Sequence, residues 1–175
     1  GHSGTLTFSG ALNNSAATNA TQLNFNNADG TYNFDGTVSI DSSAGTGIGI
    51  YVAATSSGTV DFDNSLTIAT ASGMAILMAG PGSLDVSGGS LDVDITTGTG
   101  LSQSAGTVAL SDTTSIRAST TGTGINANGG TLSVASGAGT AEVISASGQG
   151  LLLSGVITGT GGVTFDTVSS GGGAN

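Results

Sequence analysis

Paired carboxylates are the residues of this sequence best suited to chemistry. Asp61 and Asp63 are spaced i, i+2, as are Asp92 and Asp94, so each pair would project from one face of a strand. Carboxylates about 5–10 Å apart hydrolyse glycosides when the pKa of one of them is raised. No aromatic residue near either pair is placed to stack on a sugar, and no long loop could wall a groove. We expect outward solvating charges, with a carbohydrate-active β-helix as an alternative.

Three of the aspartates are also candidate ligands for a cation. Asp61 and Asp85 fall 24 positions apart, at equivalent places in a repeat described below, where their charges would repel. Calcium binds several carboxylate oxygens at once. Asp61, Asp63 and Asp85 are therefore candidate ligands for an adventitious Ca²⁺. The phrase GGSLDVDI lacks the order of the calcium-binding repeat GGxGxDxUx, so no resident metal or cofactor is expected.

Other catalytic arrangements lack their residues. The chain has no cysteine or lysine, and its single histidine is His2, so a Ser-His-Asp triad would have no base inside the fold. Arg117 stands alone between apolar neighbours, and we expect it to point outward and pair with a nearby aspartate. The phrases GTGINANGG and GTGLSQSAG resemble GxGxxG, but no helical pattern follows to bind a phosphate. We predict no catalytic and no cofactor-binding residue.

Composition narrows the partners. The net charge is −10, which excludes nucleic acid because phosphate binding needs a Lys/Arg surface. Charged residues make up 7% of the chain against a usual figure of about 25%, while 37% are hydrophobic. The apolar residues are evenly spaced, which indicates order rather than disorder. No apolar run reaches the 18 or so residues of a membrane span, so direct membrane insertion is not expected.

A repeat of about 25 residues organises the sequence. One apolar series recurs every 24 residues and predicts a ladder in the core, formed by Val60, Leu84, Val108, Leu132 and Val156. A companion series lies two residues further on, formed by Phe62, Val86, Leu110 and Val134. A third series recurs every 25 residues, formed by Leu66, Leu91, Ile116 and Ala141. Apolar residues at i and i+2 share one face of a strand.

Glycine marks a corner in each repeat. The expected corner glycines are Gly47, Gly73, Gly100, Gly124 and Gly150, within phrases such as GTGI and GTGL. The apolar residues that follow them are expected to be the first inward residues of each coil, namely Ile48, Met74, Leu101, Ile125 and Leu151. Glycine is suited to such corners because it adopts positive φ and allows close backbone approach.

Three short strands per repeat predict an all-β fold, a right-handed, three-sided parallel β-helix of five to six coils. Residues 22–175 are expected to form a single solenoid domain, a segment of a longer repeat protein. Residues 1–21 fit the repeat poorly and are expected to form an irregular cap or a distorted first coil. An antiparallel β-sandwich is the alternative, since short strands at intervals of about 8–10 residues suit it too.

A row of hydroxyls suggests another function. Thr59, Ser83, Thr107 and Thr131 are expected to stack on the outside of the fold. Ranks of threonine are the surface that ice-binding solenoids present, which makes ice binding an alternative. The positions two residues on are Asp61, Asp85, Ala109 and Ser133, so charge interrupts the second rank in two coils.

The phrases GTVSIDSSAGTGIGIYV, SGTVDFDNSLTIAT, TTGTGL and GGVTFDTVSSGGGAN resemble the β-strand repeats of large secreted bacterial surface proteins. These are autotransporter passengers and filamentous-haemagglutinin-like adhesins. The resemblance implies a non-enzymatic stalk at the bacterial surface or outside the cell, whose partner is a glycan or protein on a host or neighbouring cell. End-to-end self-association into a filament is a further alternative.

Overall fold

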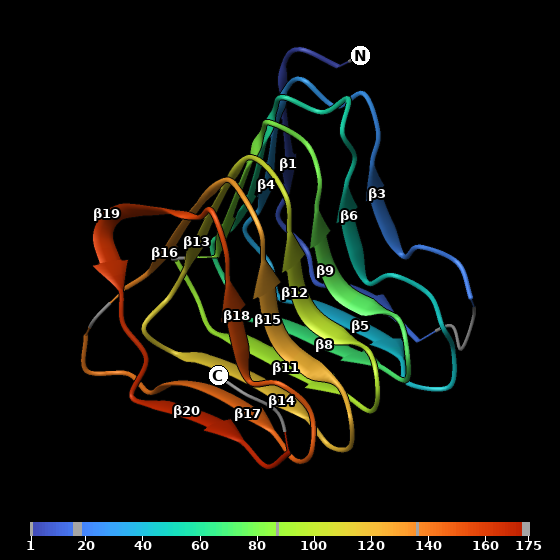
Figure 1. Ribbon diagram of the computed structural model, residues 1–175. Helices are drawn as coiled ribbons and strands as arrows, with labels where there is room; N and C mark the ends of the chain where they lie inside the picture. The colour runs from blue at the N-terminus through green and yellow to red at the C-terminus, as the bar shows by residue number, and fades with distance from the viewer. Residues whose placement is uncertain (1, 16–18, 87, 136, 173–175) are drawn as a thin grey trace.

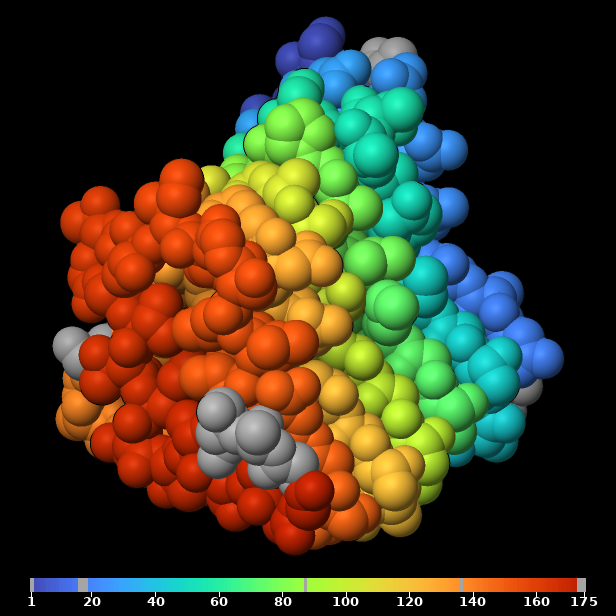
Figure 2. Space-filling model, in the orientation of Figure 1, coloured from blue at the N-terminus to red at the C-terminus, as the bar shows by residue number. Residues whose placement is uncertain are grey.

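The structure is a computed structural model that describes residues 2–15, 19–86, 88–135 and 137–172. In this part of the chain, short strands follow one another around three sheets, and each circuit of three strands forms one coil (Figure 1). Every strand pairs in parallel with the equivalent strand of the next coil. The coils stack as successive bands across the molecule (Figure 2).

Each sheet takes one strand from each coil. The first sheet contains β1 (Thr5–Phe8), β4 (Thr31–Phe34), β7 (Thr59–Phe62), β10 (Ser83–Val86), β13 (Thr107–Leu110), β16 (Thr131–Val134) and β19 (Ile157–Val163). The second contains β2 (Leu12–Asn14), β5 (Val38–Ser42), β8 (Leu66–Thr70), β11 (Leu91–Ile95), β14 (Thr114–Ala118), β17 (Ala141–Ser145) and β20 (Thr167–Ser170). The third contains β3 (Leu23–Phe25), β6 (Ile50–Val52), β9 (Met74–Met78), β12 (Thr99–Gln103), β15 (Thr123–Ala127) and β18 (Leu151–Leu153).

The predicted three-sided parallel solenoid is confirmed, and the antiparallel sandwich is wrong. Right-handed coiling stays a prediction, based on the usual hand of parallel connections. The irregular start at residues 1–21 is more regular than expected, because β1 and β2 pair with β4 and β5 and so belong to the first coil. Residues 16–18 of that segment lie outside the described residues.

The core lies inside the three sheets because strand residues alternate between the interior and solvent. In β11 and β14, for example, the first, third and fifth residues are buried. Phenylalanines fill the first coils: the ring centroids of Phe8 and Phe34 are 4.7 Å apart, and those of Phe34 and Phe62 are 4.8 Å apart, with nearly parallel rings. Aliphatic residues continue this column, where Leu110 pairs with Val86 on one side and Val134 on the other. Stacking the coils therefore buries side chains that no single coil could cover.

The third predicted series is wrong by two residues at one coil. Leu66 pairs with Leu91 as expected, but Leu91 pairs with Thr114 rather than Ile116. Ile116 instead lies between Val93 and Val143. A shift of two residues keeps the same face inward, so the apolar pattern alone did not reveal it.

In the described part of the chain, no helix has the length and apolar character needed to cross a bilayer.

Candidate functional site

The predicted core ladder forms over four of its five members. Val60, Leu84, Val108 and Leu132 pair in register and are at most 2% exposed. The fifth member is wrong: Leu132 pairs with Thr158, and Val156 lies just before β19, partly buried against the core. The register shifts between Leu132 and Val134, because β19 has extra residues between the partners of these two positions. A ladder counted at a fixed step of 24 therefore failed at the last coil.

The predicted corner glycines belong to two different columns. The first contains Gly47, Gly73, Gly98, Gly122 and Gly148, where a side chain on each of the last four would strike a backbone carbonyl of the coil before. The second contains Gly49, Gly100, Gly124 and Gly150, with Ala75 at the same level. Gly47 and Gly73 are thus corner residues as predicted, whereas Gly100, Gly124 and Gly150 lie two positions past their corners.

The second column faces the interior. A Cβ on Gly49, Gly100 or Gly124 would strike a core side chain, that of Ile68, Ile116 or Val143 respectively. None of these glycines has a positive φ, so close approach rather than backbone conformation explains them. The same offset corrects the first inward residues: Leu101 and Ile125 are aligned with Ile76, not with Met74. Met74 and Ile48 are only half-buried, on the outside of the fold.

The aspartates lie on the outside, as expected. Asp61 pairs with Asp85 on the first sheet. Partial burial, followed by the charges of Asp63, Asp85 and Asp35, raises the pKa of Asp61 above its usual value of 3.8. On the second sheet, Asp92 is partly covered and Asp94 is exposed. Among the described residues, no three His, Asp or Glu side chains come close enough to hold a metal ion, so the calcium candidate gains no support.

The two basic residues do not meet the carboxylate pairs. Arg117 is exposed as predicted, but its ion pair is with Glu142 of the next coil rather than with an aspartate. The hydroxyl of Ser115 donates to the same carboxylate at 3.1 Å. His2 lies beside Tyr32, with ring centroids 5.4 Å apart. The arrangement brings no base and nucleophile together in the described part of the chain.

The predicted hydroxyl row exists on the first sheet. Thr59 pairs with Ser83, Ser83 with Thr107, and Thr107 with Thr131. The hydroxyls of Thr59 and Ser83 lie 3.0 Å apart and hydrogen-bond to each other. Carboxylates at the positions of Asp61 and Asp85 flank this row, so it offers no flat uncharged rank of threonines.

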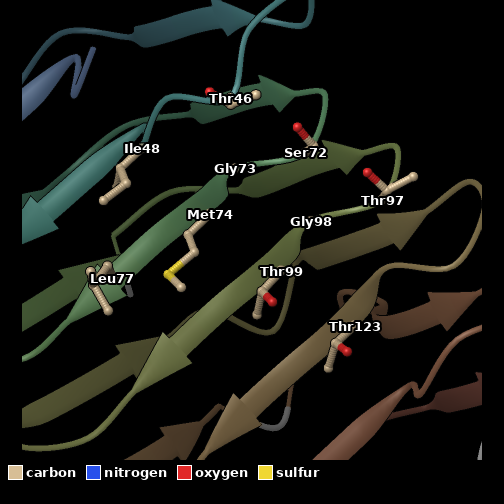
Figure 3. A pocket seen from close by; sticks show the side chains of 10 residues that line it. All are labelled: Thr46, Ile48, Ser72, Gly73, Met74, Leu77, Thr97, Gly98, Thr99 and Thr123. Carbon is tan, nitrogen blue, oxygen red and sulfur yellow. The ribbon is translucent and has the colours of Figure 1, made fainter. Parts of the chain in front are cut away.

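A different surface, which we call the corner groove, was missed from the sequence. It is a hollow of about 440 Å³ where the turns from the second sheet enter the third. One row along the turns contains Thr46, Ser72 and Thr97, and a second row contains Ile48, Met74, Thr99 and Thr123 (Figure 3). The side chain of Leu77 lies further along β9 (Figure 3). The groove thus combines hydroxyls with an apolar floor across four coils.

The sequence carried a signal for this groove. The phrase Thr-Gly-Thr occurs at residues 97–99 and 121–123, and Thr-Gly-Ile and Ser-Gly-Met occupy the equivalent places at 46–48 and 72–74. The central glycines form the first glycine column and allow the flanking side chains to project outward together. We had interpreted the glycines as corners and the following residues as core, which concealed the outward row.

The comparisons with known proteins add no identity. No family model, no curated protein and no solved structure matches the chain.

Proposed function

We propose that this chain is a non-enzymatic structural and adhesive stalk segment of a bacterial surface or secreted protein. The observation that carries the proposal is the continuity of the three sheets. Backbone hydrogen bonds link each coil to the next, and the core runs without interruption from Phe25 to Val143. Such a rod holds surfaces at a fixed distance, and its outward faces are available to a partner.

The composition supports exposure outside a cell. The chain has no lysine, and its single arginine, Arg117, lies within β14. Trypsin-like proteases therefore find one site, in the middle of a paired strand that must open before cleavage. The resemblance of the repeat phrases to secreted bacterial surface proteins favours the same location.

Antibodies against this chain test the proposal on cells that produce the protein. We expect labelling of intact cells, or capture of the chain from their medium. Protease added outside intact cells should remove the label only after long exposure. Labelling that needs permeabilised cells, with none of the chain in the medium, would refute the extracellular stalk.

End-to-end association is a second candidate, supported by apolar side chains at both ends of the stack. Leu6 and Phe8 of β1 are 44% and 36% exposed, and Ile157 of β19 is 66% exposed. Parallel strands with exposed edges pair with further strands. Light scattering over a wide concentration range should then show growing assemblies, and monomers throughout would eliminate this candidate.

A further inference from the structure

The corner groove and the third sheet beside it carry no charged residue. All eleven acidic residues and Arg117 lie in the first and second sheets or in other turns. The six strands of the third sheet contain no Asp, Glu, Lys or Arg, and neither do residues 43–49, 71–73, 96–98, 119–122 and 146–150 that lead into it. In a chain of net charge −10, this is an uncharged face, and it selects against partners held by ion pairs.

The hydroxyls in the groove are available to a ligand. Elsewhere hydroxyls are used within the protein, as in the contact of Ser65 with Ser90 at 3.1 Å. Among the described residues, no protein partner accepts from or donates to the hydroxyls of Ser72, Thr97 and Thr99. Ser72 and Thr97 are exposed and Thr99 is half-buried, so all three are accessible. Each hydroxyl offers one donor and two acceptor lone pairs.

The floor of the groove is apolar. Met74 and Leu77 of β9 are half-buried, and Ile48 lies at the same level as Met74 in the preceding coil (Figure 3). Hydroxyls along one side of an apolar floor match a sugar ring, which has hydroxyls around its edge and C–H groups on its faces. The two rows repeat from coil to coil at about 4.8 Å, so the matching ligand is a polymer that lies along the rod.

Two other occupants fit less well. An extended peptide is usually held by the free edge of a sheet, but the backbone of β9 is already paired on both sides, with β6 and β12. A second copy of the chain would contact the third sheet over about 500 Å² per partner, from strand spacing and length, against the roughly 800 Å² of a specific interface. An acidic polysaccharide would be repelled by the net charge of −10.

We propose that the corner groove binds an uncharged polysaccharide, with the hydroxyls of Ser72, Thr97 and Thr99 hydrogen-bonded to the sugar and Met74 and Leu77 beneath its ring. The proposal rests on the adhesive role above and names its ligand class. The mechanism needs no metal and no ion pair, so binding should change little with salt.

The test uses the full chain and a variant without two of the hydroxyls, Thr97→Val/Thr99→Val. Valine has nearly the shape of threonine and a high strand propensity, so the fold should persist. The matched control is Thr107→Val/Thr131→Val, which removes two hydroxyls from the row on the first sheet. Circular dichroism verifies that both variants keep the strand content of the parent chain.

The probes are soluble glucan, mannan and galactan as neutral polymers, and polygalacturonate as an acidic one. Affinity electrophoresis should show retardation of the parent chain by at least one neutral polymer, unchanged at high salt. The groove variant should bind about ten-fold more weakly, as expected for two lost hydrogen bonds, and the control should bind like the parent. Retardation by none of the neutral polymers, equal losses in both variants, or preference for polygalacturonate would overturn the proposal.

Sedimentation of the same samples addresses the second copy. A dimer that dissociates in the groove variant would assign this face to self-association and overturn the polysaccharide site. The cell-surface experiment above does not depend on the groove. Surface labelling without polysaccharide binding would leave the stalk standing and eliminate only the groove as its ligand site.

Discussion

Replacement of Gly98 by alanine tests whether the first glycine column exists because the coils approach closely. A Cβ on Gly98 would overlap the carbonyl oxygen of Gly73 and lie 2.8 Å from its carbonyl carbon. Gly10 provides the matched control, because a Cβ there meets nothing within 4 Å. Neither glycine has a positive φ, so backbone conformation does not distinguish the two substitutions.

The expected loss follows from the hydrogen bonds at the corner. The N–H of Thr99 donates to the carbonyl of Gly73 at 3.1 Å, and the N–H of Thr123 donates to that of Gly98 at 2.9 Å. To admit the methyl group the corner must shift, which weakens two bonds worth about 1 kcal/mol each. Crowding of a packed site adds about 1–3 kcal/mol. Gly98→Ala should therefore cost about 3 kcal/mol or more, whereas Gly10→Ala should be neutral or stabilise by about 0.5 kcal/mol.

Thermal unfolding followed by circular dichroism measures the difference. For a chain of this size, about 3 kcal/mol corresponds to a fall in Tm of about 6–12 °C. Urea titration of both variants gives the same comparison as free energies of unfolding. If Gly98→Ala melts with Gly10→Ala, close approach does not explain the column, and the tight stacking of the corners is wrong.

Three further substitutions test the core and the surface charges. Asp61→Asn should raise Tm near pH 7 and leave it unchanged near pH 3: the raised pKa means that the fold loses stability as pH rises through it and Asp61 ionises, and a pH series of melts verifies this. Phe34→Ala should cost about 3–5 kcal/mol because Phe34 is 2% exposed between two stacked rings, and Phe8→Ala should cost less in the same urea titration because Phe8 is 36% exposed. Ser145→Ala should cost about 1–3 kcal/mol in urea, since the buried hydroxyl donates to Gly122 O at 2.7 Å and accepts from Gly148 N–H at 2.9 Å; no loss would mean that water replaces it.

The repeat made most of the fold predictable. Period and alternation placed Val60, Leu84, Val108 and Leu132 in one ladder, because equivalent residues of a parallel solenoid lie directly above one another. The errors came where coil length changes. A shift of two residues leaves the inward face unchanged, so neither the pairing of Leu91 with Thr114 nor the outward position of Met74 disturbed the apolar pattern.

The corner groove was harder to predict because glycine has two uses in this chain. Gly98 spaces the turns, whereas Gly100 lies against the core side chain of Ile116, and both fall within one phrase of alternating threonine and glycine. Sequence spacing does not separate these two roles. The unpaired hydroxyl of Thr99 depends on which side of the strand faces solvent, which the register with Met74 and Thr123 establishes.

The in-register pairing of β10, β13 and β16 has a consequence for how such a chain changes length over generations. Ser83 pairs with Thr107 and Thr107 with Thr131, so the same place on the coil recurs after 24 residues on both occasions. A gene that duplicated the codons for residues 83–106 would encode one more coil whose upper and lower surfaces already match their neighbours. Growth or shortening by whole coils therefore requires no new packing solution, and the distance that the rod spans becomes a trait that recombination can adjust in steps of about 4.8 Å.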